Sequence, residues 1–101
     1  MLVNFTLPLF FFLYIYYMEA HYKTLQTIYT ITHQDPQPVT YQCRPREIIL
    51  RQFQDWSVIQ QHLALLEEEG LVVTMQKDTL IISITLAGID KVLSANFNYQ
   101  T

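Results

Sequence analysis

The first 18 residues contain no charged side chain, and this constrains the chain more than any other feature. They hold 15 apolar residues and seven of the fourteen aromatic ones, interrupted only by Asn4, Thr6 and Pro8. In the rest of the chain 36 of 83 residues are apolar, which is ordinary for a globular domain. The sequence therefore predicts a hydrophobic extension over residues 1–17 and one domain over residues 18–101.

The extension fits none of the usual targeting segments well. A secretory signal peptide needs a basic start and a small-residue cleavage site, yet no Lys or Arg precedes Lys23. A membrane anchor needs about 20 apolar residues, more than this run supplies. Three interpretations stay open: a misplaced start with the true one at Met18, a membrane anchor, or a packed structural element. We expect a cytoplasmic protein, unless residues 1–17 anchor it, and membrane contact only through those residues.

Charge and rare residues exclude several classes of protein. Six Lys and Arg against nine Asp and Glu give a net charge of −3, which excludes a strongly basic, histone-like nucleic-acid binder. The single cysteine, Cys43, excludes an internal disulfide framework and a cysteine-rich zinc site. The two glycines, Gly70 and Gly88, lie too far apart for a glycine-rich phosphate loop.

Apolar periodicity predicts helices over residues 18–33, 45–54, 58–69 and 86–95. Pro45 suits a first helical turn, and Asp55 or Ser57 is a good N-cap for the third helix. Gly70 suits the left-handed position that ends this helix, and Thr85 can cap the last one. A single long helix over residues 45–69 is the alternative to the second and third.

Two β-branched runs, residues 71–76 and 79–85, predict a hairpin around the turn Gln76-Lys77-Asp78. In the second run Leu80, Ile82 and Ile84 alternate with more polar positions. After Pro36 and Pro38, residues 39–42 are expected to form a short edge strand. The apolar faces of all these elements predict the core: Leu25, Ile28, Ile49, Phe53, Ile59, Leu63, Leu66, Leu71, Ile82, Ile84, Ile89, Val92 and Leu93.

This order of elements resembles the winged helix-turn-helix over about residues 20–96. One string is similar to the junction of recognition helix and wing in MarR-, ArsR- and PadR-type prokaryotic regulators: Ile59-x-x-His62-Leu63-x-x-Leu66-x-x-x-Gly70-Leu71-Val72. A second is similar to the join between their wing and the following helix: Ile84-Thr85-x-x-Gly88-x-x-x-Val92-Leu93. The resemblance implies an α+β fold with a three-helix core, a β-hairpin wing and a C-terminal helix.

The resemblance also implies an interface with double-stranded DNA. The first helix of the helix-turn-helix crosses the DNA backbone and the second enters the major groove. The cations near the first of these two helices and in the wing would contact phosphates: Arg44, Arg46, Arg51 and Lys77. Outward positions of the third helix would read bases, since glutamine pairs with adenine and alanine can touch a thymine methyl group: Ser57, Gln60, Gln61 and Ala64.

Three features depart from the usual pattern. The turn between the second and third helices, Gln54-Asp55-Trp56, contains no glycine or other small residue. The wing is short, and Lys77 is its only cation. The third helix carries no Lys or Arg between Asp55 and Gly70.

Enzymatic chemistry has little support in the sequence. His21, His33 and His62 fall on different predicted elements, and His62 is expected to be structural; with Glu69 it supplies at most two metal ligands. Cys43 stands beside two arginines that favour a thiolate, but no histidine completes a nucleophile. The run Glu67-Glu68-Glu69 is most simply the solvated end of a helix. We therefore expect no catalytic residue, cofactor or metal.

The interpretation favoured by the sequence is a small DNA-binding regulator of transcription, acting as a homodimer because one subunit offers few phosphate contacts. The rival interpretation is a winged helix that binds another protein, which the net charge and the cation-free third helix favour.

Overall fold

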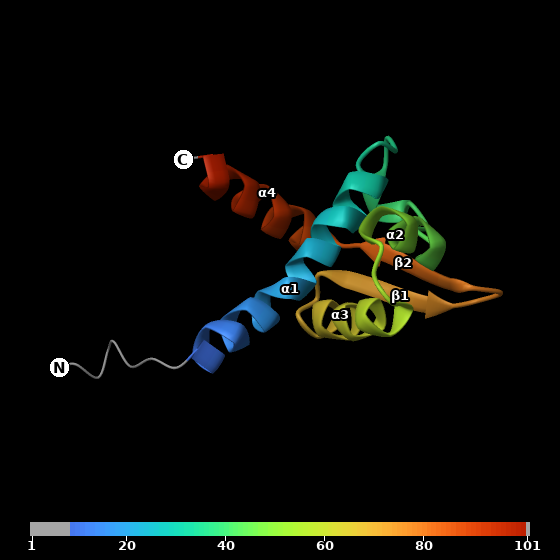
Figure 1. The fold of residues 1–101 in the computed structure, drawn as a ribbon. Coiled ribbons are helices and arrows are strands. Elements are labelled where there is room, and N and C mark those ends of the chain that lie inside the picture. The colour runs from blue at the N-terminus through green and yellow to red at the C-terminus, as the bar shows by residue number, and fades with distance from the viewer. Residues whose placement is uncertain (1–8, 101) are drawn as a thin grey trace.

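A long first helix begins the fold, and a β-hairpin lies between the third and fourth α-helices (Figure 1). The computed structural model describes the backbone of residues 9–100 and the side chains of residues 20–94. Its elements follow in chain order: α1 (Leu9–Thr32), η2 (Pro38–Thr40), α2 (Pro45–Gln52), α3 (Trp56–Glu68), β1 (Val72–Gln76), β2 (Leu80–Ile84) and α4 (Leu86–Gln100). The fold is therefore of the α+β class, with an antiparallel hairpin that follows three of the helices.

Helix α1 starts earlier than the sequence predicted. It begins at Leu9 rather than at residue 18, so it is continuous across the predicted domain boundary. Figure 1 shows its first half projecting from the body that α2, α3 and the hairpin form. Residues 1–8 of the predicted extension lie outside the described residues. Within the described part of the chain, no helix combines the length and apolar character needed to cross a membrane.

The hairpin has the predicted position. Strands β1 and β2 pair antiparallel in the register Val72↔Ile84 to Gln76↔Leu80, and the turn is closed by the Lys77 N–H donating to the Thr79 carbonyl at 3.0 Å. The edge strand predicted over residues 39–42 is wrong. Pro38 opens a 3-10 turn there instead, and the extended pairing is confined to Cys43, whose backbone exchanges two hydrogen bonds with Ile82.

Residues 45–69 form two separate helices, so the single long helix over this range is excluded. Helix α2 ends at Gln52, two residues before its predicted end, because Phe53 takes a left-handed conformation. Helix α3 begins after Asp55, which stands at the N-cap position without a side-chain capping bond. Its first backbone bonds run from the Val58 and Ile59 N–H groups to the Asp55 carbonyl.

Gly70 ends α3 as predicted, with a φ of 76°. The Leu71 N–H donates to the Leu66 carbonyl and the Gly70 N–H to the Glu67 carbonyl, which is the pair of bonds that defines a Schellman motif. This motif turns the chain from α3 directly into β1.

Thr85 caps α4 as predicted, and its hydroxyl makes a second bond that joins two elements. Its Oγ1 accepts from the Gly88 N–H at 3.0 Å and donates to the Gly70 carbonyl at 2.7 Å. Gly88 lies so close to the Leu71 carbonyl that a Cβ there would stand 2.3 Å from its oxygen. The start of α4 therefore packs directly on the exit from α3.

The core lies between α1, α3 and the inner face of the hairpin. Most of the predicted core residues are buried, and Ile49 and Ile89 pack against them half-buried. Two predicted members are wrong: Phe53 is 86% exposed and Leu93 is 48% exposed. Ile81, placed on the more polar face of the hairpin, is buried. The buried cluster is Leu25, Ile28, Ile31, Cys43, Ile48, Ile59, Leu63, Leu66, Leu71, Val72, Ile82, Ile84 and Val92.

Candidate nucleic-acid interface

Helix α3 has a buried face and an outward face that carries the predicted base-reading residues. Ile59, His62, Leu63 and Leu66 are buried at helical spacing. The four predicted base readers all lie on the opposite face and are all exposed: Ser57, Gln60, Gln61 and Ala64. The first half of the outward face is therefore polar and uncharged, with hydroxyl and amide groups that can donate and accept hydrogen bonds.

The three arginines predicted to contact phosphates all point to solvent. Arg44 occupies the N-cap position of α2, Arg46 lies in its first turn and Arg51 in its last, and each is exposed. The Arg44 guanidinium donates from Nη1 to the Thr79 hydroxyl at 3.3 Å. Arg44 thus joins the start of α2 to the turn of the hairpin.

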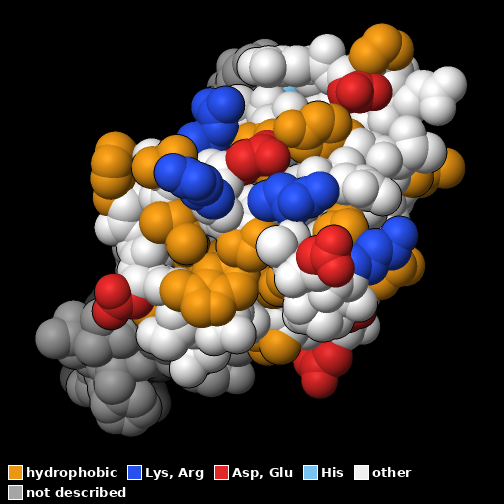
Figure 2. All heavy atoms as spheres, turned by 90° about the vertical axis from the view of Figure 1, so that its right-hand side faces the viewer, with side chains coloured by type: hydrophobic (Ala, Val, Ile, Leu, Met, Phe, Trp, Pro, Cys, Tyr) orange, Lys and Arg blue, Asp and Glu red, His pale blue; other side chains and the backbone are white. Residues whose placement is uncertain are grey.

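The predicted interface residues gather at one end of the molecule. Figure 1 shows α2, the start of α3 and the hairpin turn at the end opposite the two chain termini. Lys77, also exposed, lies in that turn. Figure 2 views this end and shows Lys and Arg side chains interspersed with acidic and hydrophobic ones. The surface is therefore mixed in charge, not a continuous positive strip.

The turn from Phe53 to Asp55 separates α2 from α3. Phe53 has φ 55° and ψ 40°, and its N–H donates to the Ile49 carbonyl at 2.9 Å. Sequence reasoning placed Phe53 in the core because it continues the apolar spacing of α2. The chain turns after the eight residues of α2, and no glycine is present at that point. The left-handed conformation of the turn is therefore taken by an aromatic residue, and the missing glycine was the available signal for this.

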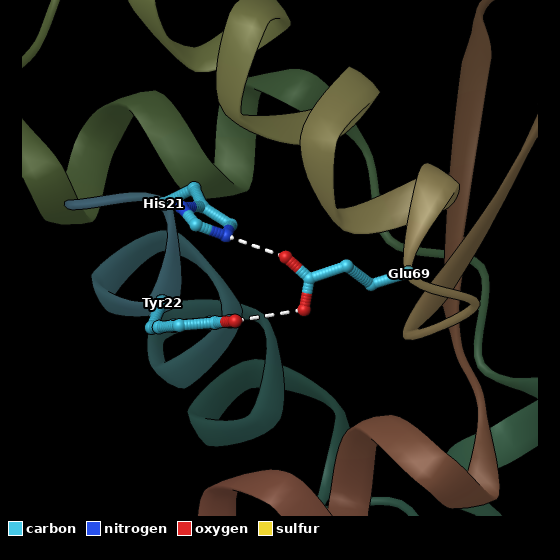
Figure 3. A network of polar contacts seen from close by, with 3 residues as sticks. All are labelled: His21, Tyr22 and Glu69. Atoms are coloured by element: carbon cyan, nitrogen blue, oxygen red, sulfur yellow. Dashed lines mark hydrogen bonds and ion pairs between the residues drawn. The ribbon is translucent and has the colours of Figure 1, made fainter. Parts of the chain in front are cut away.

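Helix α3 and its C-cap residue Glu69 are tied to α1 by polar contacts. His21 Nε2 is 3.0 Å from Glu69 Oε2, and the Tyr22 hydroxyl donates to Glu69 Oε1 at 2.7 Å (Figure 3). His62 Nδ1 is hydrogen-bonded to the Thr24 hydroxyl at 2.7 Å, and both side chains are buried. The predicted structural role of His62 is confirmed.

These contacts set the charge states within the α1–α3 interface. Burial, followed by the nearby His21, holds the pKa of His62 below its ordinary value. Partial burial acts to raise the pKa of the Glu69 carboxyl, but the hydrogen bonds from Tyr22 and His21 outweigh it and lower that pKa. Lys91 of α4 lies 4.7 Å above the Tyr22 ring, and its charge acts in the same direction on Glu69.

The prediction that Glu67, Glu68 and Glu69 are simply a solvated helix end is wrong for two of them. Besides the Glu69 contacts, the Glu67 carboxylate accepts from the Thr74 hydroxyl at 2.8 Å and from the Thr74 N–H at 3.3 Å. The end of α3 is therefore fastened both to α1 and to β1. The partners could not be found from spacing because they lie on elements distant in sequence.

Cys43 is a core residue and not a thiolate. Its side chain is fully buried, and this burial raises the pKa of the thiol to about 12, reinforced by the charge of Glu47. The favourable charge of Arg51 and a backbone contact with Arg44 act against this rise without reversing it. Among the residues that the structure describes, no group of three or more His, Cys, Asp and Glu side chains is placed to hold a metal ion.

The comparisons with known proteins add no relative. No protein-family model matches the chain, and no curated protein is significantly similar to it.

Proposed function

We propose that this chain is a winged-helix DNA-binding protein that regulates transcription as a homodimer. The observation that carries the proposal is the outward face of α3, where Ser57, Gln60 and Gln61 are exposed, with the start of α3 at the same end of the molecule as α2 and the turn of the hairpin (Figure 1). Amide and hydroxyl side chains on a helix of this kind suit the donor and acceptor pattern of base edges. The order of helices and hairpin, with Thr85 and Gly70 at its joints, agrees with the resemblance.

In this mechanism α3 enters the major groove and reads bases through its first half. Arg46 and Arg51 contact phosphates of the backbone that α2 crosses. Lys77 contacts the flanking backbone from the hairpin turn. The Arg44–Thr79 bond holds that turn beside α2, so the two phosphate-binding regions keep a fixed spacing.

The low charge of the chain sets the strength and form of binding. Arg44, Arg46, Arg51 and Lys77 allow about four phosphate contacts for each subunit, which gives a modest salt-dependent affinity. A symmetric dimer doubles these contacts and reads two half-sites. With a net charge of −3, non-specific binding should be weak even at low salt.

A titration of mixed-sequence duplex DNA with the full chain tests the proposal, with mobility shift or fluorescence anisotropy as the readout. We expect binding at micromolar protein and about 50 mM salt, weakening as salt rises. Arg46→Ala and Arg51→Ala should each weaken binding to all sequences and flatten the salt slope by about one unit for each bound subunit. Lys91→Ala, which removes an exposed cation on α4, is the matched control and should leave the slope unchanged.

Base reading is tested separately from phosphate binding. Gln60→Ala and Gln61→Ala should leave the salt slope unchanged and reduce the preference for a selected site, by about 1–3 kcal/mol for a bidentate pair. The preferred site is obtained by repeated selection from a random duplex pool. Absence of any DNA binding by the unaltered chain at about 50 mM salt would contradict the proposed function.

A second candidate function is a protein-binding winged helix, and the mixed surface in Figure 2 favours it. The end of α3 is acidic, with Glu67 and Glu68 exposed, and Leu50 and Phe53 are exposed apolar side chains near its start. This candidate predicts no shift of duplex DNA at any salt concentration. The same titration therefore separates the two functions.

A further inference from the structure

Phe53 is the only residue other than glycine with a positive φ in the part of the chain that the structure describes. At φ 55° and ψ 40° an L-residue with a bulky side chain brings its Cβ close to its own backbone, which costs free energy. Glycine or asparagine would adopt the same turn more easily. The turn therefore has an aromatic residue where a smaller one would suit the fold better.

The Phe53 side chain contributes little to the packing of the fold, because the residue is 86% exposed. The bond that ends α2 runs from its backbone N–H to the Ile49 carbonyl and would form with any residue except proline. Backbone outliers whose side chains do not stabilise their own fold are concentrated at functional sites. An aromatic ring in this position points to a contact made outside the chain.

The neighbours of Phe53 in the chain indicate what that contact is. Arg51 precedes it by two residues and Arg46 lies on the same short helix, both exposed, while Ser57 follows four residues later at the start of α3. Figure 2 shows hydrophobic side chains next to Lys and Arg on this end of the molecule. Nucleic acid matches that combination, since phosphates take the cations while sugars and thymine methyl groups offer apolar surface. An acidic protein segment is the alternative.

We propose that the Phe53 ring is an apolar DNA contact at the centre of the interface, placed between phosphate contacts from Arg51 and base contacts from Ser57. The inference rests on the proposed function and adds to it a residue that neither donates hydrogen bonds nor carries charge. The ring would lie against the sugar and thymine-methyl surface of the groove that α3 enters. The ring is exposed in the free protein and would be covered when the DNA binds.

The test compares variants at position 53 with the unaltered full chain. Phe53→Gly and Phe53→Asn remove the ring and suit the left-handed backbone, so both should unfold at the same or a higher temperature. Both should bind mixed-sequence duplex DNA about tenfold more weakly, as expected for losing part of a buried ring. The salt slope should not change, because an apolar contact releases no counterions. Phe53→Leu should keep most of the affinity.

Leu86→Asn is the matched control, because Leu86 is another exposed apolar residue and lies at the far end of the hairpin from its turn. It should not alter DNA affinity. If the unaltered chain binds DNA and Phe53→Gly and Phe53→Asn bind equally well, the role of Phe53 is wrong and the proposed function stands. A change in salt slope for those variants would also overturn the apolar contact. If the unaltered chain does not bind DNA, both proposals fail.

Discussion

At the scale of single residues, His62 makes the stability of the fold depend on pH. It is buried on α3 against α1, which faces it with the Thr24 hydroxyl and with His21, itself bonded to Glu69. Its pKa is lowered, first by burial and then by His21, so the unfolded chain binds this proton more tightly than the folded chain does. The stability contributed by neutral His62 is fully present above the unfolded-state pKa of about 6.5 and is lost as the pH falls from there through the lower pKa of the folded chain.

We therefore expect the free energy of unfolding to decrease between about pH 7 and pH 5, as measured by urea denaturation. The variant His62→Gln, which keeps a hydrogen-bonding group near Thr24 but does not titrate, should flatten this decrease. His33→Gln, at an exposed position after α1, is the control and should keep it. An unchanged pH profile in His62→Gln would show that another group is responsible.

What the sequence predicts at this scale depends on how local the cause is. The burial of His62 follows from the apolar spacing of α3, and the caps at Gly70 and Thr85 follow from neighbouring residues. The bonds of Glu69 to His21 and Tyr22 do not, because 48 and 47 residues separate these partners in the chain. The exposure of Phe53 was missed for a different reason: continuing the spacing of α2 by one residue ignores the turn that begins there.

At the scale of elements, α3 depends on the leucines of its buried face. Leu63 and Leu66 are 3% and 0% exposed, so Leu63→Ala and Leu66→Ala should each lower the free energy of unfolding by about 2–5 kcal/mol. Ala64, between them on the outward face, is the control: Ala64→Ser should cost less than about 1 kcal/mol. Denaturant titration of the three variants measures these differences. Equal tolerance at all three positions would mean that the faces of α3 are assigned wrongly.

The joint between α3 and α4 gives a second prediction at this scale. Gly88→Ala places a Cβ against the Leu71 carbonyl oxygen and the Ile84 side chain, so α4 must shift, and the cost should reach about 3 kcal/mol. Gly70→Ala meets no atom within 4 Å and is opposed only by its φ of 76°, at about 1–2 kcal/mol. Thermal unfolding should therefore rank Gly88→Ala as the more damaging variant. The reverse order would contradict the close packing at Gly88.

The order of the four α-helices and the hairpin was predicted correctly, whereas the short strand before α2 and some boundaries were not. Pro45, Gly70 and Thr85 mark α2, the end of α3 and the start of α4, because caps and prolines act locally. The strand predicted over residues 39–42 is wrong, because the residue that pairs with β2 is Cys43, one position beyond the predicted range. The exposure of the four predicted base readers on α3 follows from helix periodicity, whereas a contact such as that of Arg44 with Thr79 does not follow from spacing.

At the scale of the whole molecule, the positions of the buried residues predict that the extension over residues 1–17 is not needed for folding. The described core side chains of α1 begin with His21 and continue through Leu25, Ile28 and Ile31. A chain that starts at Met18 keeps all of them, so we expect it to stay soluble and to unfold cooperatively in a thermal scan. It places His21 in the first turn of the helix, where fraying should weaken the bond to Glu69.

The truncated chain should therefore unfold at a somewhat lower temperature than the full chain while keeping one sharp transition. His21→Ala in the full chain is the matched control, since it removes the same bond without shortening the helix. An insoluble protein, or one without a cooperative transition, would mean that residues 1–17 fill part of the core.

The contacts at the base of the hairpin limit where related sequences can gain or lose residues. Gly70, Leu71, Thr85 and Gly88 hold the two ends of the hairpin together through hydrogen bonds and direct backbone packing. An insertion or deletion near these residues would separate them, whereas one between Lys77 and Asp78 changes only the reach of the hairpin. Related chains should therefore vary in length at the turn and conserve the spacing on both sides of it.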